Sequence, residues 1–316
     1  MAASPVPSAA SAERGRDFEF RGVRVEDTFA EAFPMRGARV VITARSERWA
    51  REAALKMTGF ATSVIGCKCE AGVERALAPD ETPDGRPGVS VLFFTMDTEG
   101  LAKRLVERIG QTVLTCPTTA CFDGLPDVER RVEVGKALRV FGDGFQGSKM
   151  VGGRRYWRVP VMEGEFLVAE SFGAAKAIGG GNFLILAESE DAALEAAEAA
   201  VVAIEGVPGV VLPFPGGVVR SGSKVGARRY KGLLASTNDA FSPTLRAITA
   251  TALPSGVNSV LELVLDGLDA PAIERAMRVG IEAACRPGVR AISAGNYGGK
   301  LGPHHFPLRR ILTADA

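Results

Sequence analysis

The chain has 316 residues, of which 46% are hydrophobic, and its 38 Lys and Arg residues balance 37 Asp and Glu residues to a formal net charge of +1. At roughly 150 residues per domain, this length predicts two domains with sizeable cores. The charge balance gives no reason to expect nucleic acid or an anionic membrane as a partner, and no apolar run reaches the roughly 18 residues of a membrane span.

The N-terminal stretch begins MAASPVPSAASAERGRD, which is small and polar and lacks the apolar core of a signal peptide. We therefore expect residues 1–20 to form a disordered leader. The next segment, VEDTFAEAF at 25–33, places two acids and a Thr where a helix is expected to start.

Four units of strand, helix and strand follow. Each strand is a short run of Val, Ile, Leu or Phe, and each helix repeats apolar residues at i, i+3, i+4 and i+7. The expected units are 38–44, 46–59 and 60–66; 88–96, 98–110 and 111–116; 182–189, 190–206 and 207–214; and 258–268, 269–284 and 285–293.

Two such units in tandem make a split β-α-β arrangement, so four units predict an α+β protein of two ferredoxin-like sandwiches. We place an N-terminal α+β lobe at 21–164 and a C-terminal α+β lobe at 165–316. The sequence around the boundary between the lobes, from KALRVFGDGF to EFLVAESFG, is rich in aromatic residues, Val and Gly and predicts hairpin insertions. A doubly wound parallel sheet is the alternative fold, but no nucleotide-binding fingerprint follows the first strand.

Glu262 is a carboxylate in the middle of an apolar strand, NSVLELVLDG. Alternation predicts that Leu261, Leu263 and Leu265 face the helices and that Glu262 faces the other side of the sheet. That side is either solvated, which would make Glu262 an ordinary surface residue, or it forms an apolar cleft. In a cleft, desolvation would raise the pKa of Glu262 and favour a neutral acid.

Glycine-rich loops carry the remaining polar clusters. GVVRSGSK at 217–224 does not match a phosphate loop, because its Lys follows Ser, and GGGNF allows close approach of a ligand or only a flexible turn. ASTNDAFSP and SAGNYGGKLG come before and after the fourth unit, and TCPTTACFDG follows a predicted strand. Turn chemistry explains any one cluster, but loops that follow strands often build sites.

The five cysteines are irregularly spaced, which indicates reduced thiols in a cytoplasm. No Cys-x-x-Cys pair exists, and the two histidines, His304 and His305, are adjacent, so we expect no metal site. Cys116 and Cys121 are either small buried residues or a nucleophilic thiol.

The same segments resemble the formylmethanofuran–tetrahydromethanopterin formyltransferase family over about residues 22–305. The resemblance rests on ordered stretches that include TGFATSVIGCKCEAGVE, RIGQTVLTCPTTACFDG, VPVMEGEFLVAESFG, PFPGGVVRSGSKVG and PGVRAISAGNYGGKLG. It implies transfer of a formyl group between methanofuran and N5 of tetrahydromethanopterin, which act as co-substrates, with no permanently bound cofactor and no metal. It also implies a cytoplasmic homotetramer and, in methylotrophic bacteria, a formyltransferase/hydrolase complex that oxidises formaldehyde to formate.

By resemblance, the family's protonated glutamate near the formyl carbon corresponds to Glu262, which we predict to be catalytic. The predicted substrate-binding residues are Thr28, Gly179, Gly180, Gly181, Ser236, Thr237, Asn238, Asn296 and Lys300. Two other functions stay open: a non-catalytic component of the same complex that binds the coenzyme without turnover, and an acyltransferase that uses Cys116 or Cys121.

Overall fold

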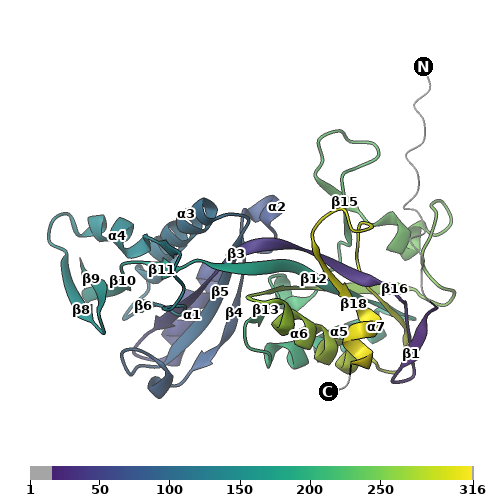
Figure 1. Cartoon of the computed structure of the whole chain (residues 1–316), viewed down its shortest axis with the longest axis horizontal. Coiled ribbons are helices and arrows are strands. Elements are labelled where there is room, and N and C mark those ends of the chain that lie inside the picture. Colours follow the sequence, from purple (N-terminus) through teal and green to yellow (C-terminus); the bar gives the residue numbers. More distant parts are fainter. Residues whose placement is uncertain (1–15, 315–316) are drawn as a thin grey trace.

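One mixed sheet runs through the whole computed structural model, which describes residues 16–314 (Figure 1). Within these residues the sheet has 14 strands and is divided between two lobes. None of the helices in the same range is long and apolar enough to cross a membrane.

The N-terminal lobe contains the first two units. Its strands lie in the order β6-β3-β5-β4 and are all antiparallel to their neighbours. The elements are β3 (Phe29–Thr43), α1 (Glu47–Thr58), β4 (Glu70–Leu77), β5 (Gly88–Thr95), α3 (Thr98–Arg108) and β6 (Ala120–Asp123), with α2 (Val64–Cys67) between α1 and β4. The side chain of Asp97 caps α3 by accepting a bond from the backbone N–H of Gly100.

The C-terminal lobe repeats this arrangement, with the antiparallel order β17-β12-β16-β13. Its elements are β12 (Ala175–Ala187), α5 (Glu190–Glu205), β13 (Val210–Val211), β16 (Ser259–Gly267), α6 (Ala270–Ala284) and β17 (Val289–Ser293). Ser189 caps α5 and Asp269 caps α6 through their side-chain oxygens. Both helices pack on the same side of the sheet, which holds the core of the lobe.

The two lobes are joined by strand pairing. β3 continues out of the N-terminal lobe and pairs with β12, residues 33–37 against 175–179. β1 (Phe18–Phe20) and β2 (Val23–Val25) extend the C-terminal sheet beside β17, and β18 (His304–Pro307), which leads into α7 (Leu308–Thr313), pairs with the start of β3. The structure therefore places residues 18–32 with the C-terminal lobe, although they precede the N-terminal one.

The hairpins predicted between the lobes are present and extend the N-terminal sheet. They comprise β8 (Gly147–Val151), β9 (Arg154–Val161) and β10 (Gly164–Ala169), with β10 parallel to β6. α4 (Val134–Leu138) precedes them, and two short strands, β7 (Arg131–Val132) and β11 (Phe172–Gly173), pair beside them. A separate hairpin of β14 (Ser223–Val225) and β15 (Ala235–Thr237) projects from the C-terminal lobe.

Several predicted elements were wrong. Residues 18–20 of the expected leader form β1, because Phe18 and Phe20 pack against the C-terminal core; residues 1–15 lie outside the described range. The expected helix start at 25–33 is the beginning of β3, whose alternate residues Ala30 and Ala32 are buried. The strands expected at 60–66 and 111–116 occur later, as β4 and β6.

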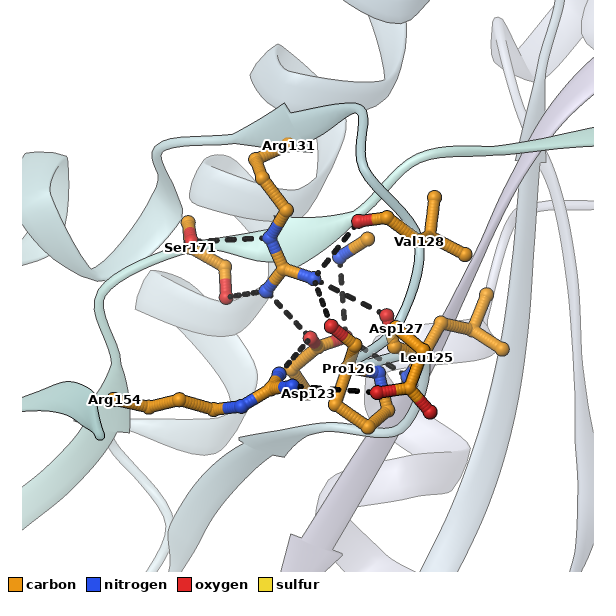
Figure 2. A network of polar contacts seen from close by, with 9 residues as sticks. Asp123, Leu125, Pro126, Asp127, Val128, Arg131, Arg154 and Ser171 are labelled. Atoms are coloured by element: carbon orange, nitrogen blue, oxygen red, sulfur yellow. Dashed lines mark hydrogen bonds and ion pairs between the residues drawn. The ribbon is translucent and has the colours of Figure 1, made fainter. Parts of the chain in front are cut away.

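Arg131 organises the segment that follows β6 (Figure 2). Its guanidinium donates to Asp123 Oδ2 at 2.5 Å, to the carbonyl of Leu125 at 3.1 Å and to the carbonyl of Ser171 at 2.8 Å. Asp123 Oδ1 accepts the backbone N–H groups of Leu125 and Gly173. The Asp123 side chain is only 5% exposed, and Arg154 lies 3.7 Å from it. One ion pair thus holds the loop and the β7–β11 pair to β6.

Replacing Arg131 by Met is expected to lower the free energy of unfolding by about 3 kcal/mol, the lower end for breaking a buried ion pair. The matched control is Arg158→Met, which removes an Arg–Glu165 pair whose side chains are 46% and 48% exposed. That change should cost much less, because an ion pair in solvent contributes little to stability. Urea denaturation of both variants measures the difference, and equal losses would contradict the assignment of Arg131 as the central residue.

Candidate functional site

Glu262 lies on the face of β16 that is turned away from the helices. Leu263 and Leu265 are fully buried in the core with α5 and α6, as alternation predicts. Across the sheet, Glu262 is paired with Leu184 of β12. Its side chain lines a cavity of about 40 Å³ together with Leu184, Val219, Arg220, Ser221, Gly222, Asn238, Phe241, Ser242 and Val260.

The helix-free face is covered by the chain between β13 and β16. The backbone N–H of Val219 donates to the carbonyl of Glu262 at 2.7 Å, and the N–H of Glu262 donates to the carbonyl of Val219 at 2.9 Å. Further along, Leu253 and Val257 form a small apolar cluster with Leu184 and other residues of this face. Glu262 is half-buried and lines a cavity beneath this segment, so it does not lie on a freely solvated face as the alternative supposed.

Burial raises the pKa of Glu262 to about 7. No cation among the described residues forms an ion pair with it that would oppose this shift. A carboxyl with a pKa close to neutrality populates both the acid and the base, which suits a group that gives and takes a proton in one reaction cycle.

Glu31 is a second buried carboxyl, and it shapes the loop at 295–302. It is 2% exposed and accepts backbone N–H bonds from Tyr297 at 2.7 Å, Gly299 at 3.0 Å, Gly302 at 2.9 Å and Leu301. Burial by itself raises the pKa of Glu31, but the four backbone donors outweigh it and hold the pKa below the usual range. Glu31 therefore stays charged and fixes the loop to β3.

The loop held by Glu31 brings Tyr297 towards Glu262. Burial raises the pKa of the Tyr297 phenol, and the negative charges of Glu262 and Glu31 raise it further. The phenol is therefore within electrostatic reach of both carboxyls. Tyr297 and the predicted residue Lys300 share this loop. The conformation of the loop therefore decides whether their side chains face the Glu262 site.

The structure brings together Thr28 and Asn296, two of the predicted site residues, although they are far apart in the sequence. The amide of Asn296 donates to Thr28 Oγ1 at 2.9 Å and to the carbonyl of Phe29 at 3.2 Å. Lys300 is exposed near the tip of the loop and forms no ion pair within residues 16–314.

Of the cluster at 236–238, Asn238 lines the Glu262 cavity and the other two residues do not. Ser236 donates to the carbonyl of Gly226 at 2.6 Å across the β14–β15 hairpin, and Thr237 is exposed on that hairpin. Asp239, the next residue, forms ion pairs with Lys224 and Arg228.

The three glycines at 179–181 form a bulge where β12 passes from β3 to β16. A Cβ at Gly179 would lie 2.2 Å from the Met35 sulfur, and Gly180 has a φ of +89°, a conformation that favours glycine. The N–H of Gly180 donates to Asp266 Oδ1 at 3.1 Å. These glycines permit close packing between the lobes and do not line the Glu262 cavity.

The sequence interpretation missed Glu31, Tyr297 and the stretch at 219–222. GVVRSGSK does not match a phosphate loop, and it instead supplies backbone and Arg220 to the cavity. The one signal for Glu31 was its place in a strand whose neighbours are Ala30 and Ala32, which is the same pattern that drew attention to Glu262.

The two candidate cysteines, Cys116 and Cys121, offer poor nucleophiles. Burial raises the pKa of Cys116 and, to a greater extent, that of Cys121, which is completely buried. Within the described part of the chain, no three His, Cys, Asp or Glu residues are grouped so that they could hold a metal ion.

Comparison with known proteins relates the chain to one family along its length. A model described as "Formylmethanofuran-tetrahydromethanopterin formyltransferase" matches residues 18–161, and a model of the proximal lobe of the same family matches residues 164–311. The formylmethanofuran–tetrahydromethanopterin formyltransferase of Methylobacillus flagellatus is 61% identical over 300 residues, which cover 92% of this chain and 99% of the relative. A component of the formyltransferase/hydrolase complex of Methylorubrum extorquens is 50% identical, with 95% and 99% covered.

Two solved structures have the same fold. The formyltransferase from Methanosarcina barkeri superimposes with a TM-score of 0.89 at 52% identity, covering 93% of this chain and all of that one. A chain of the formyltransferase/hydrolase complex of Methylorubrum extorquens, solved in complex with methylofuran, gives a TM-score of 0.91 at 50% identity, covering 94% and 99%.

Replacing Glu31 by Gln is expected to loosen the 295–302 loop, because a charged acceptor of four N–H bonds becomes a single neutral oxygen. Losing hydrogen bonds to a charged group costs about 1.5–3 kcal/mol each. Amide hydrogen exchange at Tyr297, Gly299 and Gly302 should therefore accelerate at least about tenfold, while Glu19→Gln on exposed β1 leaves it unchanged. Unaltered exchange at these amides in Glu31→Gln would show that the carboxylate does not hold the loop.

Proposed function

The chain belongs to the formylmethanofuran–tetrahydromethanopterin formyltransferase family, and we propose that Glu262 is the proton donor of its reaction. The activity is transfer of a formyl group between methanofuran and N5 of tetrahydromethanopterin, a step of one-carbon metabolism. Both coenzymes are co-substrates, and no permanently bound cofactor takes part. The observation that carries the assignment of Glu262 is its enclosed position beside a cavity in the C-terminal lobe, with a pKa of about 7.

The reaction exchanges one carbon–nitrogen bond for another in a ternary complex. N5 of the pterin attacks the formyl carbon, and the carbonyl electrons move onto the oxygen. The intermediate collapses when the bond to the methanofuran amine breaks. Neutral Glu262 gives its proton to the departing nitrogen and the resulting carboxylate takes the proton released from N5, so the cycle neither consumes nor produces protons.

The oxyanion of the intermediate needs donors that are already in place. Among the residues that line the cavity, Asn238 and Arg220 carry side-chain N–H groups, and neither group has a hydrogen-bond partner in the described part of the chain. We assign stabilisation of the oxyanion to Asn238, with Arg220 at the more exposed side of the cavity.

The size of the cavity limits what enters it. About 40 Å³ accommodates a formyl group or one or two water molecules, but not a pterin ring. The rings must therefore lie outside this cavity, along the 218–242 segment and the Glu31 loop. Thr28, Asn296, Lys300 and the residues at 236–237 are our proposed contacts there, and Gly179, Gly180 and Gly181 position the lobes around them.

The chain's assembly and location are also proposals. We propose a homotetramer in the cytoplasm that joins a formyltransferase/hydrolase complex, supported by the 50% identity to a chain of such a complex. We describe each lobe as ferredoxin-like, supported by the antiparallel strand order of the two lobes. We propose a division into lobes near residues 164/165, supported by the two family models, of which one ends at residue 161 and the other begins at residue 164. Residues 18–32 are the exception, because they pack with the C-terminal lobe.

A non-catalytic component that only binds the coenzyme is the alternative. The identity to relatives named as enzymes favours catalysis, and the enclosed carboxyl supports it. An assay of formyl transfer with the purified chain, with and without tetrahydromethanopterin, distinguishes the two. No transfer above the rate without protein would support the binding role.

Glu262→Gln keeps the size of the side chain but removes the titrating proton. We expect kcat to fall at least about tenfold, the lower side of what general acids contribute, with an intact fold and oligomer. Glu195→Gln on the exposed side of α5 is the control and should keep full activity. Wild-type turnover in the Glu262 variant would exclude it as the acid.

The pH dependence of kcat follows from the raised pKa. The acid is active when protonated, so kcat should be constant below about pH 7 and decline above it, by up to tenfold per pH unit for one titrating group. In Glu262→Gln, kcat should no longer decline above about pH 7. Only the pH dependence that comes from ionisation of the coenzymes should remain. If kcat declines above about pH 7 in the same way in both proteins, the decline belongs to a group other than Glu262.

A further inference from the structure

A second and larger hollow lies at the junction of the two lobes. Its volume is about 410 Å³, within the range of small-molecule sites. It is lined by Pro34, Met35, Arg36, Met96, Lys176, Ala177, Ile178, Leu268 and His304, none of which lines the Glu262 cavity. We call it the junction pocket.

The junction pocket exists because β3 changes partners along one edge. β5 pairs with β3 as far as Arg36, and β18 pairs with it from Ala32 towards its start, so within residues 16–314 no strand covers the interval between them. Pro34 occupies this interval, and proline has no backbone N–H to leave unpaired. Met96, which follows β5, and His304, which begins β18, form the two sides of the opening.

The charges around the junction pocket are unbalanced. Arg36 of β3 and Lys176 of β12 are directly opposite each other in the strand pairing. Like charges in this arrangement destabilise a sheet. Neither residue, nor His304, has an acidic partner in the part of the chain that the structure describes. The positive charges of Arg36 and Lys176 are therefore not neutralised by any acidic side chain of the described chain.

The floor of the junction pocket is apolar, and it includes Met35, Ala177 and Leu268 of the small core between the lobes. Met96 is 52% exposed at its side, although a large apolar side chain is costly to leave in water. The junction pocket thus combines two uncompensated cations with an apolar surface in one hollow.

We propose that the junction pocket binds an organic anion, whose carboxylate or phosphate group lies between Arg36 and Lys176 and whose apolar part rests on Met35 and Met96. Charge-assisted bonds from two cations are strong and favour a carboxylate or phosphate group. The pocket takes residues from both lobes, so a bound ligand bridges them. None of the residues that line this site lines the cavity beside Glu262.

Methyl NMR of the full-length protein with ¹³C-methyl methionine tests the proposal, because two of the seven methionines line the junction pocket. Phenyl phosphate is the probe. Inorganic phosphate is the control ligand that carries only the charge, and phenol is the control ligand that carries only the ring. A probe concentration of roughly 10 mM suits millimolar dissociation constants. At this concentration phenyl phosphate should shift the Met35 and Met96 methyl signals more than inorganic phosphate or phenol does. Met150 and Met162 on the outer hairpins should stay unchanged.

The variant Arg36→Gln/Lys176→Gln should weaken phenyl phosphate binding at least about tenfold, as expected for loss of charge-assisted bonds. Lys103→Gln/Lys149→Gln removes the same charge from exposed positions elsewhere and should bind like the wild type. Two results would overturn the proposal. One is that the Met35 and Met96 signals do not shift in the wild type, as when another protein chain covers the junction pocket. The other is that the Arg36/Lys176 variant binds phenyl phosphate with the same affinity as the wild type. Formyl transfer by the same variant shows separately whether the Glu262 site is intact.

Discussion

The pairing of β3 with β12 is the interaction on which the rest of the structure depends. Five residues of each strand join two sandwiches into one sheet, so the lobes are fixed by backbone hydrogen bonds as well as by side-chain packing. The close approach of the strands requires small residues: Gly37 faces Ala177 at 3.0 Å from where its Cβ would lie, and Gly179 faces Met35. β3 pairs with different strands along its length, and β12 passes from β3 to β16. The junction pocket and the bulge at 179–181 of β12 are consequences of these changes of strand partner.

Burial acts differently on the acidic groups around this junction. Glu31 has four backbone donors and stays charged, whereas Glu262 has none to offset burial and titrates near neutrality. Glu70 and Asp266 are buried against each other, and burial raises the pKa of both, so one proton between them is favoured. Asp266 Oδ2 has no donor other than such a proton among the described residues. The number of N–H groups around each carboxyl therefore decides which one is available for proton transfer.

The site is assembled from segments that come from both ends of the chain. The Glu31 loop at 295–302 is held by β3, near the N-terminus, while the cavity beside Glu262 is enclosed by the chain between β13 and β16. In the proposed mechanism only the reacting carbon needs a fixed place beside Glu262, which is why a cavity of about 40 Å³ is compatible with two large coenzymes.

The sequence by itself determined the two β-α-β units of the C-terminal lobe and most of the two units of the N-terminal lobe, because hydrophobic periodicity and caps such as Asp97 and Asp269 are local signals. It also determined on which face of β16 Glu262 lies, since alternation is a property of one strand. It misplaced β4 and β6, where the polar pattern of EAGVERAL and the short run ACFD gave weaker signals than the apolar stretches before them. Only the tertiary structure decided that the helix-free face is covered, that Glu31 binds a loop about 270 residues away in the chain, and that β3 belongs to both lobes. These are contacts between distant segments, and their energy depends on which groups meet in space, which no local pattern records.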